Sequence, residues 1–329
     1  MLTNKVKMNN NLLYFPNIDI PNNNWTIKSL LYWDKVGIIV PPSFMENPSQ
    51  YKDSTIELLR TDLIEQVFPY EYIQGKKNFD RNFIKLLSNS SFELEKKQKR
   101  FNKGKVSRIH FQKVGKELMK VLVKLKIARK FDWDWYYVES KTANLVMAYL
   151  AFYIGKKGKF LPSTDSTKNL DISLNQKGAI LKTNKIRQNL LEDLMPYPLN
   201  PDLTKLRKFK DKYHDELKSF RILIEQTAFE ISNYKSSHKK LIIQDLKIAE
   251  IQDKKEKILS ELNQSKIGQV AFGTIFGVVG SVIGFAQGNS LLGAFSLVNA
   301  VHSASQGYGK SLTLVKEYSY LALVDKNFK

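Results

Sequence analysis

The feature that most constrains this chain is an uncharged, glycine-rich segment near its C-terminal end. From Ile267 to Gly309 there is no Asp, Glu, Lys or Arg, and nine of the chain's 16 glycines lie there. Several of these glycines recur every three or four residues, which places them on one face of a helix. They are Gly273, Gly277, Gly280, Gly284 and Gly288. Because glycine costs roughly 1 kcal/mol in a helix interior relative to alanine, this pattern predicts close packing against that face.

The same segment is predicted to fold as a helical hairpin. Residues 287–290 have the composition of a turn, between a first apolar arm (272–285) and a second, shorter arm (291–301). Small residues at four-residue spacing let helices approach closely in membranes, and the first arm approaches the ~20 residues that span a bilayer. Lys266 and Lys310 flank the hairpin, as the positive-inside rule expects if both ends are cytoplasmic. The alternative is a soluble oligomer core packed through glycine.

Residues 1–175 are predicted to form a mixed α/β domain. Strands are expected at 36–40, 106–111 and 136–138. One helix is expected to start at a capping box formed by Ser54 and Glu57 and to continue to Val67. Further helices are expected over 114–125 and from Ser140 to Tyr153, with Gly155 as the C-terminal stop. Strands that alternate with helices favour a sheet covered by helices.

The rest of the chain is predicted to be helical. Residues 176–202 are predicted to form a linker with short helices. Residues 203–266 are predicted to form coiled-coil-like helices with a break near 233–240. One apolar stripe is formed by Leu217, Phe220, Ile224, Ala228 and Ile231, and another by Leu241, Ile248, Ile251, Ile258 and Leu262. Neither stripe can bury itself alone, so a partner helix or subunit is expected. Residues 310–329 return to an amphipathic pattern and form a C-terminal helix.

Composition limits the classes of function. The net charge of +20 over 329 residues indicates anionic partners, namely nucleic acid, nucleotides or an acidic membrane surface. The absence of cysteine excludes a disulfide scaffold, a thiol nucleophile, a thiolate zinc site and an iron–sulfur cluster. Lys5 and Lys7 are not followed by an apolar run, so we expect no secretory signal and a chain that begins in the cytoplasm.

Most of the positive charge is concentrated in one stretch. Residues 95–130 contain fourteen Lys or Arg against two Glu, which leaves a net charge of +12. The predicted anion-binding residues are Lys96, Lys97, Lys99, Arg100, Lys103, Lys105, Arg108, Lys113, Lys116, Lys120 and Lys124. The last four are expected to share one helix face. Such a surface binds phosphates with salt-sensitive affinity, and Phe101, His110 and Phe111 are candidates for base stacking. A solvated basic helix face is the alternative.

Signals for catalysis are weak. Glu139 and Lys141 follow a predicted strand and, with Asp132 or Asp134 upstream, have the composition of a metal-dependent nuclease site. The four histidines are widely scattered and none forms a helix-spaced metal pair. No phosphate-binding loop, dinucleotide fingerprint or nucleophile elbow is present. We therefore expect no metal and no cofactor, and a protein that is not an enzyme.

Parts of the N-terminal half have a familiar pattern. The stretch from Tyr14 to Pro21 and the stretch LLYWDKVGIIVP from Leu30 to Pro41 resemble the opening of an uncharacterised family of bacterial proteins, YxPxIxIP followed by LLYWDxxxxIVP. Residues 135–151 and Pro162 to Asp165 also resemble that family. The resemblance covers about the first half of the chain and implies no activity or catalytic residue. The layout of a soluble domain followed by an apolar tail is similar to that of bacterial anti-phage membrane effectors.

Together these features predict a mixed α/β domain followed by a long helical stalk and a glycine-rich apolar hairpin. The expected function is a membrane-perturbing or channel-forming effector of bacterial anti-phage defence, controlled by an anionic ligand such as an oligonucleotide. It is expected to be a homo-oligomer that associates with the inner face of the cell membrane. Two alternatives stay open: a soluble oligomeric nucleic-acid-binding protein, and a metal-dependent nuclease.

Overall fold

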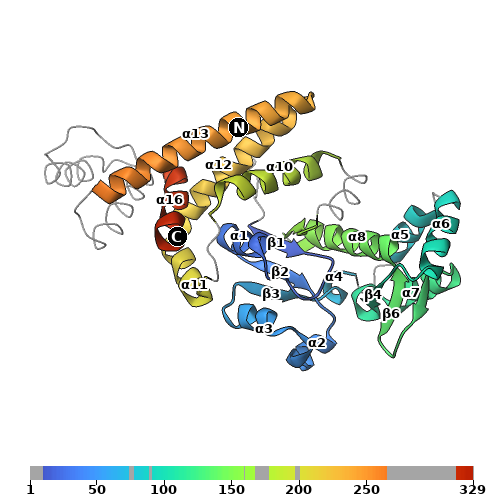
Figure 1. Ribbon diagram of the computed structural model, residues 1–329. Helices are drawn as coiled ribbons and strands as arrows, with labels where there is room; N and C mark the ends of the chain where they lie inside the picture. The colour runs from blue at the N-terminus through green and yellow to red at the C-terminus, as the bar shows by residue number, and fades with distance from the viewer. Residues whose placement is uncertain are drawn as a thin grey trace, which may run out of the picture. The chain divides into compact units, whose positions relative to one another are not determined.

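The computed structural model describes residues 10–73, 78–88, 91–158, 160–166, 178–196, 201–264 and 316–328. The chain divides into two compact units (Figure 1). The first contains Met1–Lys185 and Asp202–Arg207, and the second contains Ile186–Pro201 and Lys208–Lys329. The uncharged segment, with Gly273, Gly277, Gly280, Gly284 and Gly288, lies outside the described residues.

A four-stranded parallel sheet forms the base of the first unit. Its strands are β1 (Asn11–Tyr14), β2 (Val36–Ile39), β3 (Ile64–Val67) and β7 (Phe160–Ser163), in the spatial order β3-β2-β1-β7. Helix α1 (Asn24–Tyr32) connects β1 to β2 and begins where the Asn23 side chain accepts a hydrogen bond from the Thr26 amide at 3.2 Å. A mixed α/β first unit, as the sequence predicts, is confirmed.

The connection from β2 to β3 corrects one prediction. It contains α2 (Ser43–Glu46), η1 (Pro48–Gln50) and α3 (Asp53–Arg60). No side chain caps α3, so the predicted capping box is wrong. The helix ends at Arg60, Asp62 adopts a φ of 57°, and Ile64–Val67 pairs with β2 as a strand. Four residues with apolar side chains only at the two ends cannot be assigned to helix or strand by periodicity alone, and here the parallel partner decides.

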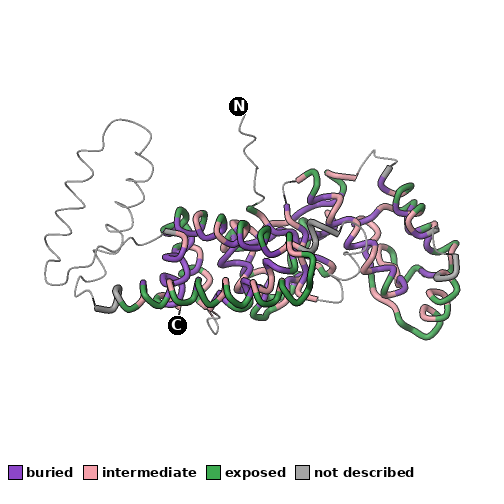
Figure 2. The backbone as a smooth tube through the Cα atoms, turned by 90° about the horizontal axis from the view of Figure 1, so that it is seen from above, coloured by how far each residue is buried: buried purple, intermediate pink, exposed green. Residues whose placement is uncertain are grey.

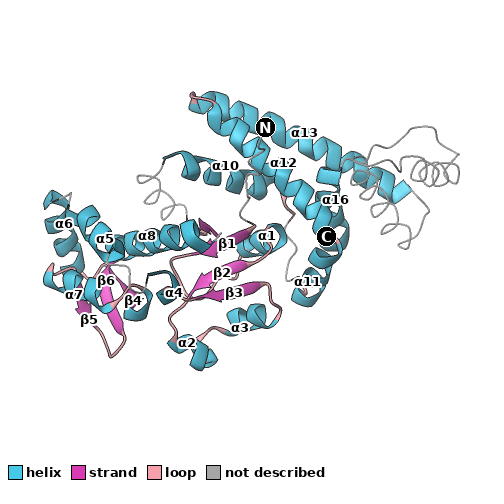
Figure 3. Ribbon diagram, turned by 180° about the vertical axis from the view of Figure 1, so that it is seen from behind, coloured by secondary structure: helices cyan, strands magenta, loops and turns pink. Residues whose placement is uncertain are grey.

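An insertion between β3 and β7 carries a second, antiparallel sheet. It begins with α4 (Tyr70–Ile73), α5 (Asn78–Ser88) and α6 (Ser91–Asn102). Strands β4 (Val106–His110), β5 (Ala128–Lys130) and β6 (Trp135–Glu139) follow in the spatial order β4-β6-β5. Between β4 and β5 lie the short 3₁₀ helix η2 (Phe111–Lys113) and helix α7 (Lys116–Lys124). Figure 3 shows the two sheets as separate groups of strands.

Helix α8 (Ser140–Gly158) joins the two sheets into one core. One cluster of buried side chains includes Leu13 of β1, Val138 of β6 and Leu150 of α8. The predicted stop at Gly155 is wrong, because the helix continues to Gly158 and Gly155 is buried inside it. A Cβ at Gly155 would lie 2.9 Å from the Phe160 carbonyl oxygen, so this residue permits the close approach of α8 to β7.

The second unit is helical. Its elements are α10 (Gly178–Leu194) from Ile186 onward, α11 (Leu203–Lys212) from Lys208 onward, α12 (His214–Asn233), α13 (Ser237–Gln264) and α16 (Lys316–Phe328). The predicted break lies between α12 and α13. Along these helices buried and exposed residues alternate, as amphipathic packing requires (Figure 2).

The C-terminal helix α16 is the partner that the apolar stripes need. All five residues of the α12 stripe are buried, as are Ile251 and Ile258 of α13, whereas Leu241 is 57% exposed. Helix α16 packs against both α12 and α13, and its residues Tyr318 to Val324 are buried. A helix of the same chain therefore packs against both helices that carry the stripes, where the sequence leaves open a partner helix or a second subunit.

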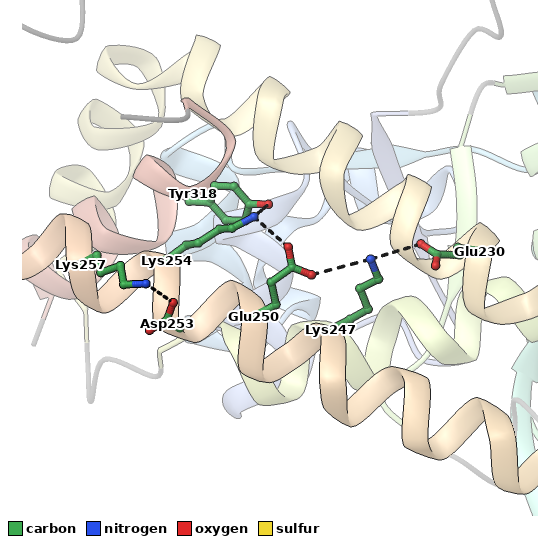
Figure 4. A network of polar contacts seen from close by, with 7 residues as sticks. All are labelled: Glu230, Lys247, Glu250, Asp253, Lys254, Lys257 and Tyr318. Carbon is green, nitrogen blue, oxygen red and sulfur yellow. Dashed lines mark hydrogen bonds and ion pairs between the residues drawn. The ribbon is translucent and has the colours of Figure 1, made fainter. Parts of the chain in front are cut away.

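Polar contacts fix α16 against α13. The Lys254 ammonium donates to the Tyr318 hydroxyl at 2.9 Å and to Glu250 at 2.8 Å (Figure 4). Lys247 lies 3.5 Å from Glu230 and so links α13 to α12 (Figure 4). Within the parts of the chain that the structure describes, no helix is both long enough and apolar enough to cross a membrane.

Candidate anion-binding site

The parallel sheet has a topological switch point next to β1. From β1 the chain continues to β2 and β3 on one side, while β7 pairs with the other side of β1. The loops that leave the carboxyl ends of β1 and β7 therefore diverge, and open α/β sheets bind ligands in the crevice that this creates. Here the Tyr14 hydroxyl at the end of β1 donates to Asp165 Oδ1 beyond β7 at 3.2 Å.

A cavity of about 620 Å³ opens at this point, between the carboxyl end of β1 and the second sheet. We call it the switch-point cavity. The loop from Pro16 to Asn22 forms one wall, and Phe44, Gln50, Lys52 and Ser54 form another. The remaining lining residues are Tyr14, Ser107, Arg108, Ile109, His110, Lys113, Trp135, Ala143, Asn144 and Met147. Its volume lies within the usual range for sites of small ligands and cofactors.

Lys113 is the most unusual group in this wall. Its side chain is only 3% exposed, at the end of η2. Among the described residues no carboxylate lies within ion-pair distance of its ammonium. Burial therefore lowers the pKa of Lys113 to about 7, although the charge of Asp19 acts in the opposite direction. A buried cation that faces a cavity in this way is expected to gain from an anionic ligand.

The other charges in the cavity are also mostly positive. Lys52 and Arg108 line it, although the Arg108 guanidinium lies over the Phe131 ring, and Asp19 is the one acidic side chain among the lining residues. Asp19 Oδ1 accepts a hydrogen bond from the Lys52 amide at 2.9 Å, which fixes the loop after β1. The hydroxyls of Ser54 and Ser107 and the amide of Asn144 add neutral hydrogen-bonding groups.

His110 is held by its neighbours. Its Nδ1 accepts a hydrogen bond from the Gln112 amide at 3.3 Å, and its Nε2 lies 3.8 Å from a carboxylate oxygen of Asp134. The ring stacks on Phe111 with centroids 5.6 Å apart and meets Trp135 edge-on at 5.0 Å. Burial lowers the pKa of His110, with the Asp134 charge opposing, so the imidazole is neutral near pH 7. His110 therefore orients the aromatic wall and adds no cation.

The eleven predicted anion-binding residues do not form one site. Arg108 and Lys113 line the cavity, whereas Lys96, Lys97, Lys99 and Arg100 lie on α6, Lys103 and Lys105 on the connection to β4, and Lys116, Lys120 and Lys124 on α7. Lys113 precedes α7 and is buried, so the expected face of four lysines is wrong. Lys120 pairs with Glu117 at 2.7 Å. The Lys116 ammonium lies 5.1 Å from the centre of the Phe111 ring.

Glu139 has a structural role that the nuclease alternative does not foresee. Its side chain is fully buried, forms an ion pair with Arg100, and accepts hydrogen bonds from the Thr142 amide at 2.8 Å and from the Thr142 hydroxyl at 2.7 Å. Glu139, rather than Ser140, therefore caps α8 with its side chain. Within the described ranges, no three acidic or histidine side chains cluster closely enough to hold a metal ion.

Sequence reasoning missed Lys52, Asp19, Trp135 and Asn144, because the cavity forms only when β1, β4, β6 and α8 come together. One signal was present. The segments that carry the family resemblance, Tyr14 to Pro21 and residues 135–151, both contribute to the wall of the cavity. Comparisons with known proteins found no matching family model, no matching curated protein and no matching solved structure.

Proposed function

We propose that the protein binds a phosphorylated ligand in the switch-point cavity and that this binding controls the action of residues 267–309 on a membrane. The observation that carries the first half is the buried ammonium of Lys113 in the wall of that cavity. The second half rests on the uncharged, glycine-rich sequence of the segment. As in the anti-phage effectors that its layout resembles, the biological role would be defence by damage to the host membrane.

A phosphate fits the cavity better than a neutral group does. Lys52, in the loop before α3, and Lys113, at the end of η2, approach the cavity from two different segments, and phosphate oxygens accept several charge-assisted hydrogen bonds at once. The indole of Trp135 offers an aromatic surface beside these cations, which suits a nucleobase. The carboxyl ends of parallel strands at a switch point are also where α/β sheets bind nucleotides. A nucleotide is therefore the proposed ligand class.

The second unit holds the helices on both sides of the proposed membrane segment. Helices α13 and α16 flank the uncharged segment in the sequence, and they pack against each other. Both ends of the segment are therefore attached to the same helical unit. If the segment inserts as a hairpin, both connections remain on one side of the bilayer, as the flanking Lys266 and Lys310 favour. Membrane association and assembly of several copies are parts of this proposal.

The ligand half is tested by calorimetric titration of the full-length protein with mono-, di- and triphosphate nucleotides and with short oligonucleotides. We expect Lys113→Met to weaken binding by about tenfold or more, because a hydrogen bond to a charged group is worth roughly 1.5–3 kcal/mol. Lys124→Met is the matched control, since Lys124 is exposed on α7 and does not line the cavity. Equal losses in both variants would show that the basic stretch acts only through its total charge.

The membrane half is tested with dye-filled vesicles that contain anionic lipid. Ligand should change the rate of dye release by the wild-type protein, and deletion of residues 267–309 should abolish release while ligand binding persists. A different set of results would favour the alternative, a soluble oligomeric nucleic-acid-binding protein. In that case the protein would bind ligand but never bind vesicles, and the deletion would abolish its oligomeric state.

A further inference from the structure

The second sheet has one buried face and one face that carries arginines and aromatic rings. Ile109, Ala128 and Val138 point into the core. On the opposite face Tyr137 stands between two arginines, since its register partners are Arg108 of β4 and Arg129 of β5. Their guanidinium carbons lie 5.9 Å and 5.4 Å from the centre of the Tyr137 ring. Side chains alternate between the faces of a strand, so this row lies on the face opposite the core cluster, where Arg108 and Arg129 are exposed and Tyr137 is half-buried.

The turn between β5 and β6 extends this pattern. The Phe131 ring lies 4.7 Å from that of Tyr137, and Arg108 lies 4.8 Å from the Phe131 centroid. At the tip, the Lys130 ammonium lies 5.4 Å from the centre of the Trp133 ring. Phe131 is 45% exposed and Trp133 is 88% exposed. In register Lys130 lies opposite Tyr136, so Lys130 and Trp133 form a pair at the tip that borders the row of Tyr137. We call the whole set the cation–aromatic face: Arg108, Arg129, Phe131 and Tyr137 on the sheet, with Lys130 and Trp133 at the tip.

The cations of this face outnumber the acids of the turn: Arg108, Arg129 and Lys130 stand against Asp132 and Asp134, which leaves a net charge of +1 (three minus two). Asp132 Oδ1 accepts hydrogen bonds from the amides of Asp134 and Trp135, at 2.9 Å and 2.8 Å, and so fixes the turn. Asp134 faces His110. The turn is thus built so that Trp133, whose side chain contributes nothing to the buried core, projects into solvent.

We propose that the cation–aromatic face binds single-stranded nucleic acid. Unpaired bases would stack on Trp133 and Phe131, and the phosphates between them would pair with the arginines and Lys130. Rings interleaved with cations are the combination that binds single strands, because every base has a π-face and every linkage has a negative charge. A duplex hides its base faces and satisfies only the charges. This inference does not rest on the proposed ligand of the cavity, because Arg129, Phe131 and Trp133 do not line it.

The test uses the full-length protein and a fluorescein-labelled oligothymidylate of about twelve nucleotides, a length within the range of known single-strand sites. We expect binding by fluorescence anisotropy at low salt, together with quenching of tryptophan emission. Trp25 and Trp33 are buried, which makes Trp133 the most accessible reporter of base stacking among the described tryptophans. Trp133→Ala and Phe131→Ala should each weaken binding by about five- to one-hundredfold.

Phe229→Ala is the matched control, because Phe229 is 63% exposed but lies on α12 of the second unit. It should leave the affinity unchanged. Arg129→Gln should lower the slope of log affinity against log salt by about one. The proposal would be overturned if the oligonucleotide does not bind at low salt. It would also be overturned if a duplex of the same length binds with equal affinity and the ring variants have no effect. A third contrary result is quenching of tryptophan emission by anionic phosphatidylglycerol vesicles without any oligonucleotide binding.

Discussion

Lys255 of α13 donates a hydrogen bond to Asp325 of α16 at 3.0 Å, and both side chains are largely buried. This pair joins the two helices between which the uncharged segment lies in the sequence. Lys255 also lies 3.1 Å from the exposed carboxylate of Glu256. If Asp325 is replaced, Lys255 therefore still has Glu256 as an ion-pair partner. If Lys255 is replaced, Asp325 loses its cation.

We expect Lys255→Met to lower the free energy of unfolding of the second unit by about 2–4 kcal/mol, because Asp325 then loses a buried cation. Asp325→Asn should cost less, since Lys255 keeps Glu256 and the amide keeps the shape of the carboxylate. The measurement is the shift of the urea midpoint followed by circular dichroism. Equal costs of the two variants would mean that Glu256 does not compensate.

Lys113→Met is expected to stabilise the protein by about 2 kcal/mol at pH 6 and by much less at pH 10. Burial lowers the pKa of Lys113 to about 7 in the folded state, whereas an unfolded lysine titrates near 10.4. The folded state therefore binds fewer protons between these values, and wild-type stability rises with pH across that interval. The cost of the buried charge is fully present below pH 7.

Thermal unfolding of Lys113→Met and wild type at several pH values measures this difference. A variant that is destabilised at pH 6 would show that the charged amine is well solvated in the cavity. Because the same variant is expected to lose ligand affinity, a gain of stability at pH 6 also separates loss of binding from loss of folding.

Glu139→Gln is expected to destabilise the first unit by about 1–3 kcal/mol, because the buried side chain loses its ion pair with Arg100 and part of the cap of α8. Lys141→Ala should be nearly neutral, since Lys141 is exposed. Thermal unfolding measures both effects. The nuclease alternative would be supported by a Mg²⁺-dependent DNA cleavage that Lys141→Ala abolishes without any change in stability.

Gly277→Leu combined with Gly284→Leu separates close packing from hydrophobicity in the uncharged segment. The two positions are seven residues apart, so they share one face of a helix. The double variant is more apolar, and vesicle binding should persist, but assembly and any dye release that depends on it should fail. Gly277→Ala with Gly284→Ala should be much milder. An unchanged oligomer in the leucine variant would mean that this face contacts nothing.

Periodic apolar patterns in the sequence predict helices where α12 and α13 lie, whereas the 17-residue helix α10 stands where a linker with short helices is expected. The α12 stripe repeats over about four turns, so its buried face could be assigned without knowledge of its partner. The strands are harder to predict from the sequence than the helices, because each strand has only three to five residues. Sequence patterns do not predict β1, β5 or β7 and place β3 in a helix, since short segments take their structure from the strands beside them.

The sequence by itself determined that residues 95–130 are strongly basic, that the chain contains a mixed α/β part and that two amphipathic helices need a partner. Only the tertiary structure decided which cations act together. Lys113 and Lys124 are alike in sequence, yet Lys113 faces a cavity and Lys124 faces solvent. Likewise α16 packs against α12, although about ninety residues separate the two helices in the sequence. Burial and long-range pairing depend on packing between distant elements, which spacing along one element cannot encode.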